Sequence, residues 1–278
     1  MPGTRIEANG LSFHVVDEGS SDRDAVLLLH GFPDSSWMWR NQIPALTTAG
    51  YRVIAPDLRG YGQSDKPQGT AAYRMPVLVT DVDAIMRSLS VERAHLVGHD
   101  WGAALAWSVA ASLPGRVRRL VAMAVGHPGA FLRSLTRSSQ AARSWYMVFF
   151  QVPRLSESML SRNDWRMFRR FGRGVPDLDK YVADLSRPGA LTAALNWYRA
   201  NAKPWRVRRL PSIRVPTLGM WGTRDVALTE TQMRESARFV DGHFRYERID
   251  AGHWMMLERP DRVNELLVDF LGEPERPD

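Results

Sequence analysis

Length, composition and charge exclude several classes of protein. The chain has 278 residues, enough to bury a sizeable core in one α/β domain with a modest insertion, and its 44% hydrophobic and 24% charged residues are typical of a folded globular protein. It has no cysteine, which excludes disulfides and thiolate metal sites. No leader pattern or apolar run of membrane-spanning length is visible, so we expect no integral membrane segment and a cytoplasmic location.

The formal charge of +7 raises the question of an acidic partner. Basic residues gather in two stretches, 166–174 and 203–210. Neither stretch belongs to a nucleic-acid-binding motif, and acidic residues are spread along the rest of the chain. We therefore interpret both stretches as solvated faces and expect no nucleic-acid partner; a membrane surface or an anionic substrate is the weaker alternative for these basic residues.

The first third of the chain alternates short apolar runs with turn signals. Residues 25–29 and 52–56 are short and, apart from Arg52, apolar, as the buried strands of a parallel sheet are. Residues 77–91 carry apolar side chains at helical spacing and lead into a strand at 94–98. The alternation continues with a helix at 103–113 and a strand at 118–126, which predicts a doubly wound, mostly parallel α/β sheet.

The pattern changes at about residue 128. From there to residue 212 the sequence is helical, rich in Arg, Trp, Tyr and Phe, and without a clear strand. Strand signals return at 216–222 and 244–250, and a helix at 260–271 closes the chain. We predict a core domain made of residues 1–127 and 213–278, with residues 128–212 inserted as a helical cap over the sheet.

The sequence GHDWG places Asp100 between two glycines where a strand meets a helix. Gly and Asp are common turn formers, so the motif alone is weak evidence, but a sharp strand-to-helix turn is where α/β-hydrolases expose their nucleophile. Asp225 and His253 each follow a later strand, and open α/β sheets place their sites at such strand ends. The order nucleophile, acid, histidine is also the chain order of α/β-hydrolases.

An aspartate nucleophile suits a saturated carbon better than an ester or amide, because attack on a carbonyl would give a reactive anhydride. Opening a strained ring, or displacing a halide, gives a covalent alkyl ester of Asp100. Water must then cleave this ester, with His253 as base and Asp225 as its orienting partner. The backbone N–H groups of Phe32, in the loop HGFP, and of Trp101 are predicted to hold the oxyanion. This chemistry needs no metal or other cofactor.

The leaving group decides between the two substrate classes. An epoxide oxygen departs as an alkoxide and needs a proton, whereas a halide departs as a stable anion. Tyr146 and Tyr198 in the predicted cap are a pair of phenols that can hydrogen-bond the oxygen and protonate it. We also expect His30, Pro33 and Trp37, in and after the HGFP loop, to contact the substrate.

Several motifs together carry a resemblance to a known family: HGFPDSSWMW, DLRGYGQSDKP, GHDWGA, LNWYR and GHWMMLERP. Over nearly its whole length the chain resembles epoxide hydrolases of the α/β-hydrolase fold, which form vicinal diols from small-molecule epoxides. LNWYR matches the family's second tyrosine closely and WYMVFFQVP matches the first less closely, which leaves Tyr181 as the alternative to Tyr146. The resemblance implies the roles of nucleophile, base, acid and oxirane-activating pair for Asp100, His253, Asp225, Tyr146 and Tyr198. A homodimer is one assembly state that remains open.

Three other readings compete with this one. Haloalkane dehalogenases share the fold and the aspartate but usually add a halide ligand, an Asn where Phe32 stands or a Trp in the cap. Fluoroacetate-type dehalogenases carry Arg where Trp101 stands. A non-enzymatic receptor would have an idle triad, whereas all three positions are filled here. We predict an epoxide hydrolase, with dehalogenation as the alternative; the cap tryptophans that could bind a halide are Trp145, Trp165 and Trp197.

Overall fold

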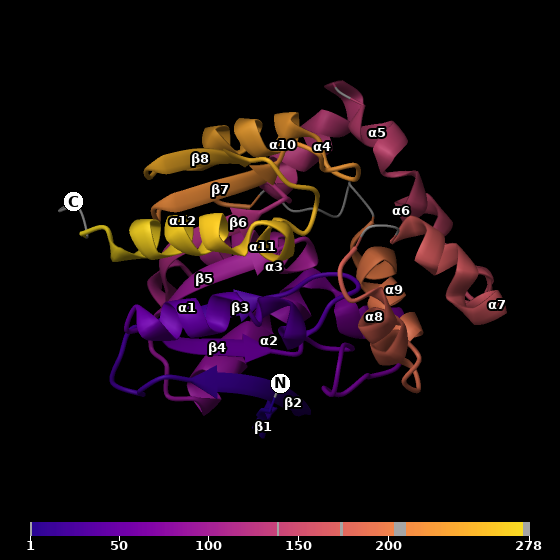
Figure 1. The fold of residues 1–278 in the computed structure, drawn as a ribbon, viewed down its shortest axis with the longest axis horizontal. Helices are drawn as coiled ribbons and strands as arrows, with labels where there is room; N and C mark the ends of the chain where they lie inside the picture. The colour runs from indigo at the N-terminus through magenta and orange to yellow at the C-terminus, as the bar shows by residue number, and fades with distance from the viewer. Residues whose placement is uncertain (1, 138, 173–174, 203–209, 275–278) are drawn as a thin grey trace.

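One eight-stranded sheet organises the molecule (Figure 1). The computed structural model describes residues 2–137, 139–172, 175–202 and 210–274. The strands lie in the order β1-β2-β4-β3-β5-β6-β7-β8; β2 pairs antiparallel with β1 and β4, and the other neighbours are parallel. The prediction of a doubly wound, mostly parallel sheet is confirmed. The strands are β1 (Thr4–Ala8), β2 (Leu11–Glu18), β3 (Ala25–Leu29), β4 (Arg52–Pro56), β5 (Ala94–His99), β6 (Val117–Met123), β7 (Thr217–Gly222) and β8 (Phe244–Ile249).

The central strands are apolar on both faces because helices cover both. Helices α2 (Met75–Ser88) and α3 (Trp101–Ser112) pack on one face, and α1 (Gln42–Thr48) and α12 (Pro260–Gly272) on the other. In β3, Leu27 and Leu29 join the first core, while Val26 and Leu28 join the second. The period of two in a strand thus divides one apolar run between two cores. Strand β1 is not predicted by the pattern, because most of its residues are exposed at the sheet edge.

Helices fill the chain between β6 and β7 in its described part. Helices α6 to α9 lie beyond the carboxyl ends of the strands, while α4 packs against α10 (Glu230–Arg234) of the core (Figure 1). The division into domains 1–127 with 213–278 and 128–212 stays a prediction, and residues 203–209 of the second basic stretch lie outside the described residues. These helices are α4 (Pro128–Arg137), α5 (Gln140–Arg143), α6 (Trp145–Phe149), α7 (Leu155–Phe171), α8 (Leu178–Leu185) and α9 (Ala190–Asn201).

Helix α9 is fastened to the sheet domain by side chains that bond backbone groups. The Trp197 indole N–H donates to the Arg59 carbonyl over 3.0 Å. The Asn201 amide accepts from the Met75 N–H and donates to the Tyr73 carbonyl, each over 2.9 Å. These bonds fix α9 against the sheet domain. The turns of α9 that precede Asn201 then face the carboxyl ends of the strands.

Candidate active site

Asp100 occupies a sharp turn between β5 and α3. Its φ of 53° and ψ of −120° are strained for a residue with a side chain. A Cβ on Gly98 would lie 2.4 Å from the Gly102 carbonyl oxygen, and one on Gly102 would lie 2.0 Å from the Leu29 oxygen. Both flanking glycines are therefore required by close backbone approach, which explains the sequence GHDWG.

A backbone N–H group binds one oxygen of this carboxylate. The Phe32 N–H donates to Asp100 Oδ1 over 2.9 Å. Trp101 is the first residue of α3, so its N–H has no acceptor within the helix. The sequence predicts that the N–H groups of Phe32 and Trp101 form an oxyanion hole. In the structure the first binds Oδ1, and the second belongs to the residue that follows the nucleophile.

His253 lies between the acid and the other oxygen of Asp100. His253 Nδ1 lies 2.8 Å from Asp225 Oδ2, and His253 Nε2 lies 3.7 Å from Asp100 Oδ2. Asp225 Oδ1 accepts from the backbone N–H groups of Ala227 and Leu228 over 2.8 and 2.9 Å. The structure brings the three predicted triad residues together, with the acid held by two backbone N–H groups of its own loop and by the imidazole.

The charges of Asp100 and His253 stabilise each other. Burial works against ionisation of both groups, but the carboxylates of Asp225 and Asp100 outweigh it and raise the pKa of His253 to about 10. Burial likewise raises the pKa of Asp100, yet its hydrogen bond and charge interaction with His253 leave that pKa below its ordinary value. At neutral pH the site therefore holds an ionised nucleophile beside an imidazolium.

Two cap tyrosines stand over the nucleophile. The rings of Tyr146, on α6, and Tyr198, on α9, have centroids 6.1 Å apart. Burial, together with the nearby charge of Asp100, raises the pKa of both hydroxyls well above 10, so both stay protonated. The rings of Trp101 and Tyr198 meet edge-on, with centroids 5.1 Å apart.

Tyr181, the alternative first tyrosine, faces elsewhere. It is fully buried on α8. Among the charged groups around it, Asp34 has the largest effect on the pKa of its hydroxyl. The structure therefore pairs Tyr146 with Tyr198 and sets Tyr181 apart from them.

The three residues expected to contact substrate lie in the loop after β3. Both ring nitrogens of His30 are engaged by backbone: Nδ1 lies 3.0 Å from the Gly31 oxygen, and Nε2 accepts from the Leu58 N–H over 2.9 Å. His30 consequently holds the loop and has no free polar atom for a substrate. Pro33 is buried, and Trp37 carries the Arg40 guanidinium 5.3 Å from its ring. Contact of substrate with Pro33 and Trp37 stays a prediction.

Three residues of the site have roles that the sequence does not reveal, although each adjoins a predicted residue. His99 Nε2 donates to the His253 carbonyl over 2.9 Å. The Trp254 indole N–H donates to Asp34 Oδ2 over 2.9 Å. Asp34 is fully buried, and this burial raises the pKa of its carboxyl to about 7 although Tyr181 and Trp254 favour its ionised form. Only the position of these residues inside the motifs HGFPD, GHD and GHW could have pointed to them.

Neither a metal cluster nor a membrane span is found in the part of the chain that the structure describes. No group of three or more His, Asp or Glu side chains there could hold a metal ion. No helix among those residues is both long and apolar enough to cross a bilayer.

Comparison with known proteins identifies the class. The family model of the alpha/beta hydrolase fold matches residues 24–260, so the chain belongs to that family. Epoxide hydrolase A of Mycobacterium tuberculosis (strain ATCC 25618 / H37Rv) is 34% identical and covers 96% of each chain, and epoxide hydrolase 4 of Mus musculus is 37% identical over 99% of this chain and 80% of its own. The crystal structure of epoxide hydrolase A from Mycobacterium thermoresistibile matches with a TM-score of 0.85 and 32% identity over 97% of this chain and 98% of its own. Within the family the chain belongs to the epoxide hydrolases, which confirms the resemblance in its motifs.

Proposed function

We propose that this protein converts a small-molecule epoxide to a vicinal diol through an alkyl ester of Asp100. One observation carries the proposal: an ionised carboxylate lies beneath two phenols that stay protonated. That arrangement supplies a nucleophile and a proton donor at once, which ring opening requires.

In the first step Asp100 Oδ2 attacks a ring carbon, and the bond from that carbon to the epoxide oxygen breaks. The oxygen takes a proton from the Tyr146 and Tyr198 pair, leaving one tyrosinate. Asp100 Oδ1, which accepts from the Phe32 N–H, becomes the carbonyl oxygen of the ester. The ester carbonyl is thus formed already seated in the oxyanion hole.

Ester formation also prepares His253 for the second step. The carboxylate of Asp100 helps to raise the pKa of His253, and esterification removes that negative charge. The imidazolium then donates its proton to the tyrosinate, which restores the phenol, and becomes a neutral base. It takes a proton from water as the water attacks the ester carbon. The Phe32 and Trp101 N–H groups hold the oxyanion, and collapse returns ionised Asp100, protonated His253 and the diol.

The same geometry argues against dehalogenation. A departing halide needs N–H donors and no proton, yet the Trp197 indole donates to the Arg59 carbonyl. The side chain of Phe32 has no N–H. A pair of protonated phenols is idle in halide release and useful only where an alkoxide departs. The cytoplasmic location and the homodimer rest on the sequence alone.

The test is to trap the ester. His253→Gln removes the base but keeps the nucleophile, so mixing with styrene oxide should add the mass of the epoxide to the intact protein. Asp100→Asn combined with His253→Gln is the matched control and should show no adduct. A bromoalkane is run in parallel, with bromide release followed. Binding of the epoxide without any adduct, or bromide release without diol formation by the unaltered protein, contradicts the proposal.

A further inference from the structure

Exposed hydrophobic side chains are concentrated on one part of the cap. Five of the seven large hydrophobic residues exposed in the described part of the chain lie between positions 145 and 159. Val148 is 73% exposed and Trp145 is 50% exposed, although both lie on a helix that packs against the site. Five exposed hydrophobic side chains within positions 145–159 point to an interaction surface rather than to scattered exposure. The five residues are Trp145, Val148, Val152, Leu155 and Met159.

Helix α6 has two faces with different tasks. Tyr146 and Phe150 meet the ring of Tyr198 at 6.1 and 4.9 Å on the inner side. Trp145 and Val148 lie on the outer side. The apolar patch and the residues that stand over Asp100 therefore lie on opposite sides of the same helix.

Helix α7 adds positive charge to the patch. Between positions 143 and 172 the chain has six arginines and two acidic residues. Both acidic groups are already paired, Glu157 with Arg199 at 2.7 Å and Asp164 with Arg169 at 3.7 Å. Four exposed arginines have no carboxylate partner in the part of the chain that the structure describes: Arg154, Arg162, Arg166 and Arg170.

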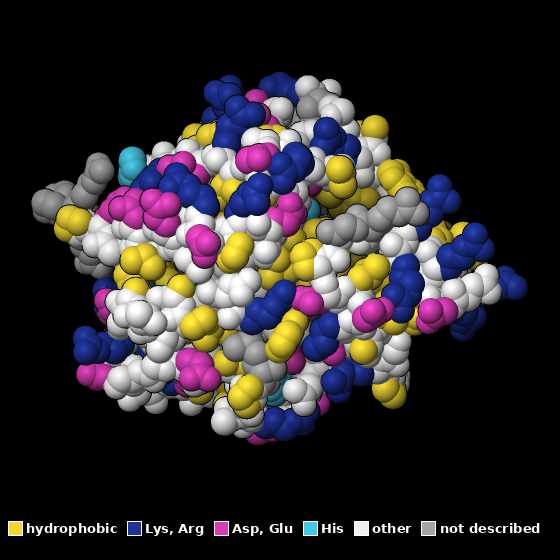
Figure 2. Space-filling model, in the orientation of Figure 1, with side chains coloured by type: hydrophobic (Ala, Val, Ile, Leu, Met, Phe, Trp, Pro, Cys, Tyr) yellow, Lys and Arg dark blue, Asp and Glu magenta, His cyan; other side chains and the backbone are white. Residues whose placement is uncertain are grey.

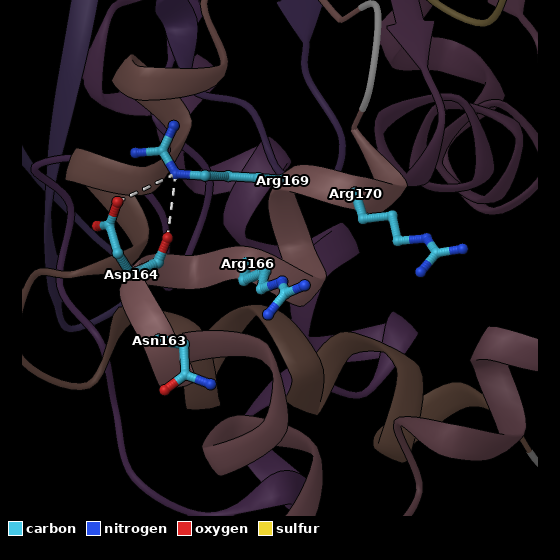
Figure 3. Close-up of a pocket in the computed structure, with 5 residues that line it drawn as sticks. All are labelled: Asn163, Asp164, Arg166, Arg169 and Arg170. Atoms are coloured by element: carbon cyan, nitrogen blue, oxygen red, sulfur yellow. Dashed lines mark hydrogen bonds and ion pairs between the residues drawn. The ribbon is translucent and has the colours of Figure 1, made fainter.

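Two of the unpaired arginines, Arg166 and Arg170, line a hollow. A cavity of about 480 Å³ on α7 is lined by Asn163, Asp164, Arg166, Arg169 and Arg170. Figure 3 shows Arg169 turned toward Asp164, whereas Arg166 and Arg170 point away from that carboxylate. In Figure 2 dark blue and yellow side chains lie together at the edge of the molecule where α6 and α7 are found.

We propose that the outer surface of α6 and α7 binds a lipid bilayer that contains anionic headgroups. The apolar side chains would enter the boundary between headgroups and acyl chains, where Trp145 is a favourable residue, and the unpaired arginines would contact headgroup phosphates. A second copy of the chain is a poorer occupant, because a symmetric contact would bring the same unpaired arginines of both copies together. Apolar substrates concentrated in the bilayer would then reach the site beside α6. The surface itself does not depend on the proposed function.

Sedimentation with lipid vesicles tests this surface. The unaltered protein should sediment with vesicles of phosphatidylglycerol and phosphatidylcholine, much less with phosphatidylcholine alone, and less as salt is added. Arg166→Glu combined with Arg170→Glu should weaken binding roughly 30-fold or more, because each arginine near an anionic surface contributes about a fivefold factor. Val148→Glu should also weaken it.

Matched controls carry the same changes elsewhere. Arg23→Glu combined with Arg93→Glu alters a groove at the amino ends of β3 and β5, and Val268→Glu alters the exposed side of α12; both should leave binding unchanged. Far-ultraviolet circular dichroism checks that each variant is folded. No sedimentation with anionic vesicles, or equal losses in the controls, overturns the proposal. So does a dimer, seen by analytical ultracentrifugation without vesicles, that Val148→Glu dissociates.

Discussion

Three aspartates of the site show how neighbours set the state of one side-chain type. Asp225 accepts from two backbone amides and from the imidazole, which fixes its orientation. Asp100 is ionised because His253 outweighs the cost of burial. Asp34 has the Trp254 indole as its hydrogen-bond donor and no positive charge in contact, so the pKa of its carboxyl rises to about 7 through burial. Because the three side chains are of one type, their surroundings set the different roles proposed for them. Asp225 orients the imidazole, Asp100 attacks the substrate and Asp34 supports the site.

Tyr198 provides a test at this scale. Tyr198→Phe should slow ring opening about 10- to 1,000-fold, because it removes a proton donor from the departing oxygen. The rate of ester formation in a single turnover, followed by rapid quenching and mass spectrometry, measures this step alone. Tyr246→Phe on β8 removes a hydroxyl that donates to Glu230 on α10, and it should have no effect. An unchanged rate in a variant that lacks both Tyr146 and Tyr198 hydroxyls would remove the support for epoxide opening and favour dehalogenation.

Among the elements, α6, α7 and α9 are held together by one arginine. Arg199 on α9 pairs with both oxygens of Glu157 on α7, at 2.7 and 2.9 Å, and donates to the Phe150 carbonyl after α6 over 2.9 Å. Burial disfavours the charge of Glu157, but Arg199 lowers its pKa to about 2. This pair therefore adds stability above the unfolded pKa of about 4.3, and the contribution is lost as pH falls toward 2.

Glu157→Gln should lower the free energy of unfolding at pH 7 by about 1–2 kcal/mol, since a charged partner of a mostly buried guanidinium is lost. The difference from the unaltered protein should shrink at pH 3, where Glu157 begins to lose its charge. Urea unfolding at both pH values measures it. Glu265→Gln breaks an exposed pair with Arg262 on α12 and should change little. A difference that grows on acidification would contradict the pairing argument.

The sequence predicts elements whose pattern is local and misses contacts made between distant segments. The strands at 25–29 and 52–56 are apolar because both faces are covered, and the turn at Asp100 has its flanking glycines beside it in the chain. The bond between Asp34 and Trp254 joins residues 220 positions apart, which no local pattern encodes. The choice between Tyr146 and Tyr181 likewise depends on how α6 and α8 pack, and no local pattern encodes the approach of the Tyr146 ring to Tyr198.

For the molecule as a whole, two groups of the site make the free energy of unfolding fall as pH rises. The folded pKa of Asp34, about 7, lies above its unfolded value near 3.9, so its contribution is full below pH 3.9 and is lost as pH rises through 7. The folded pKa of His253, about 10, lies above 6.5, so its contribution is full below pH 6.5 and is lost as pH rises through 10. The folded state therefore binds more protons than the unfolded state, through Asp34 between about pH 4 and 7 and through His253 between about pH 6.5 and 10.

The free energy of unfolding should therefore fall between pH 6 and pH 10, by on the order of 2–4 kcal/mol from these two groups. Urea unfolding at pH 6, 8 and 9.5 measures the slope, and His253→Gln combined with Asp34→Asn should flatten it because neither replacement titrates. His243→Gln, on the exposed turn before β8, is the matched control and should keep the slope of the unaltered protein. If the double variant kept that slope too, the proton held between Asp100 and Asp225 in the resting site would not be there, and His253 would enter the first step as a neutral imidazole.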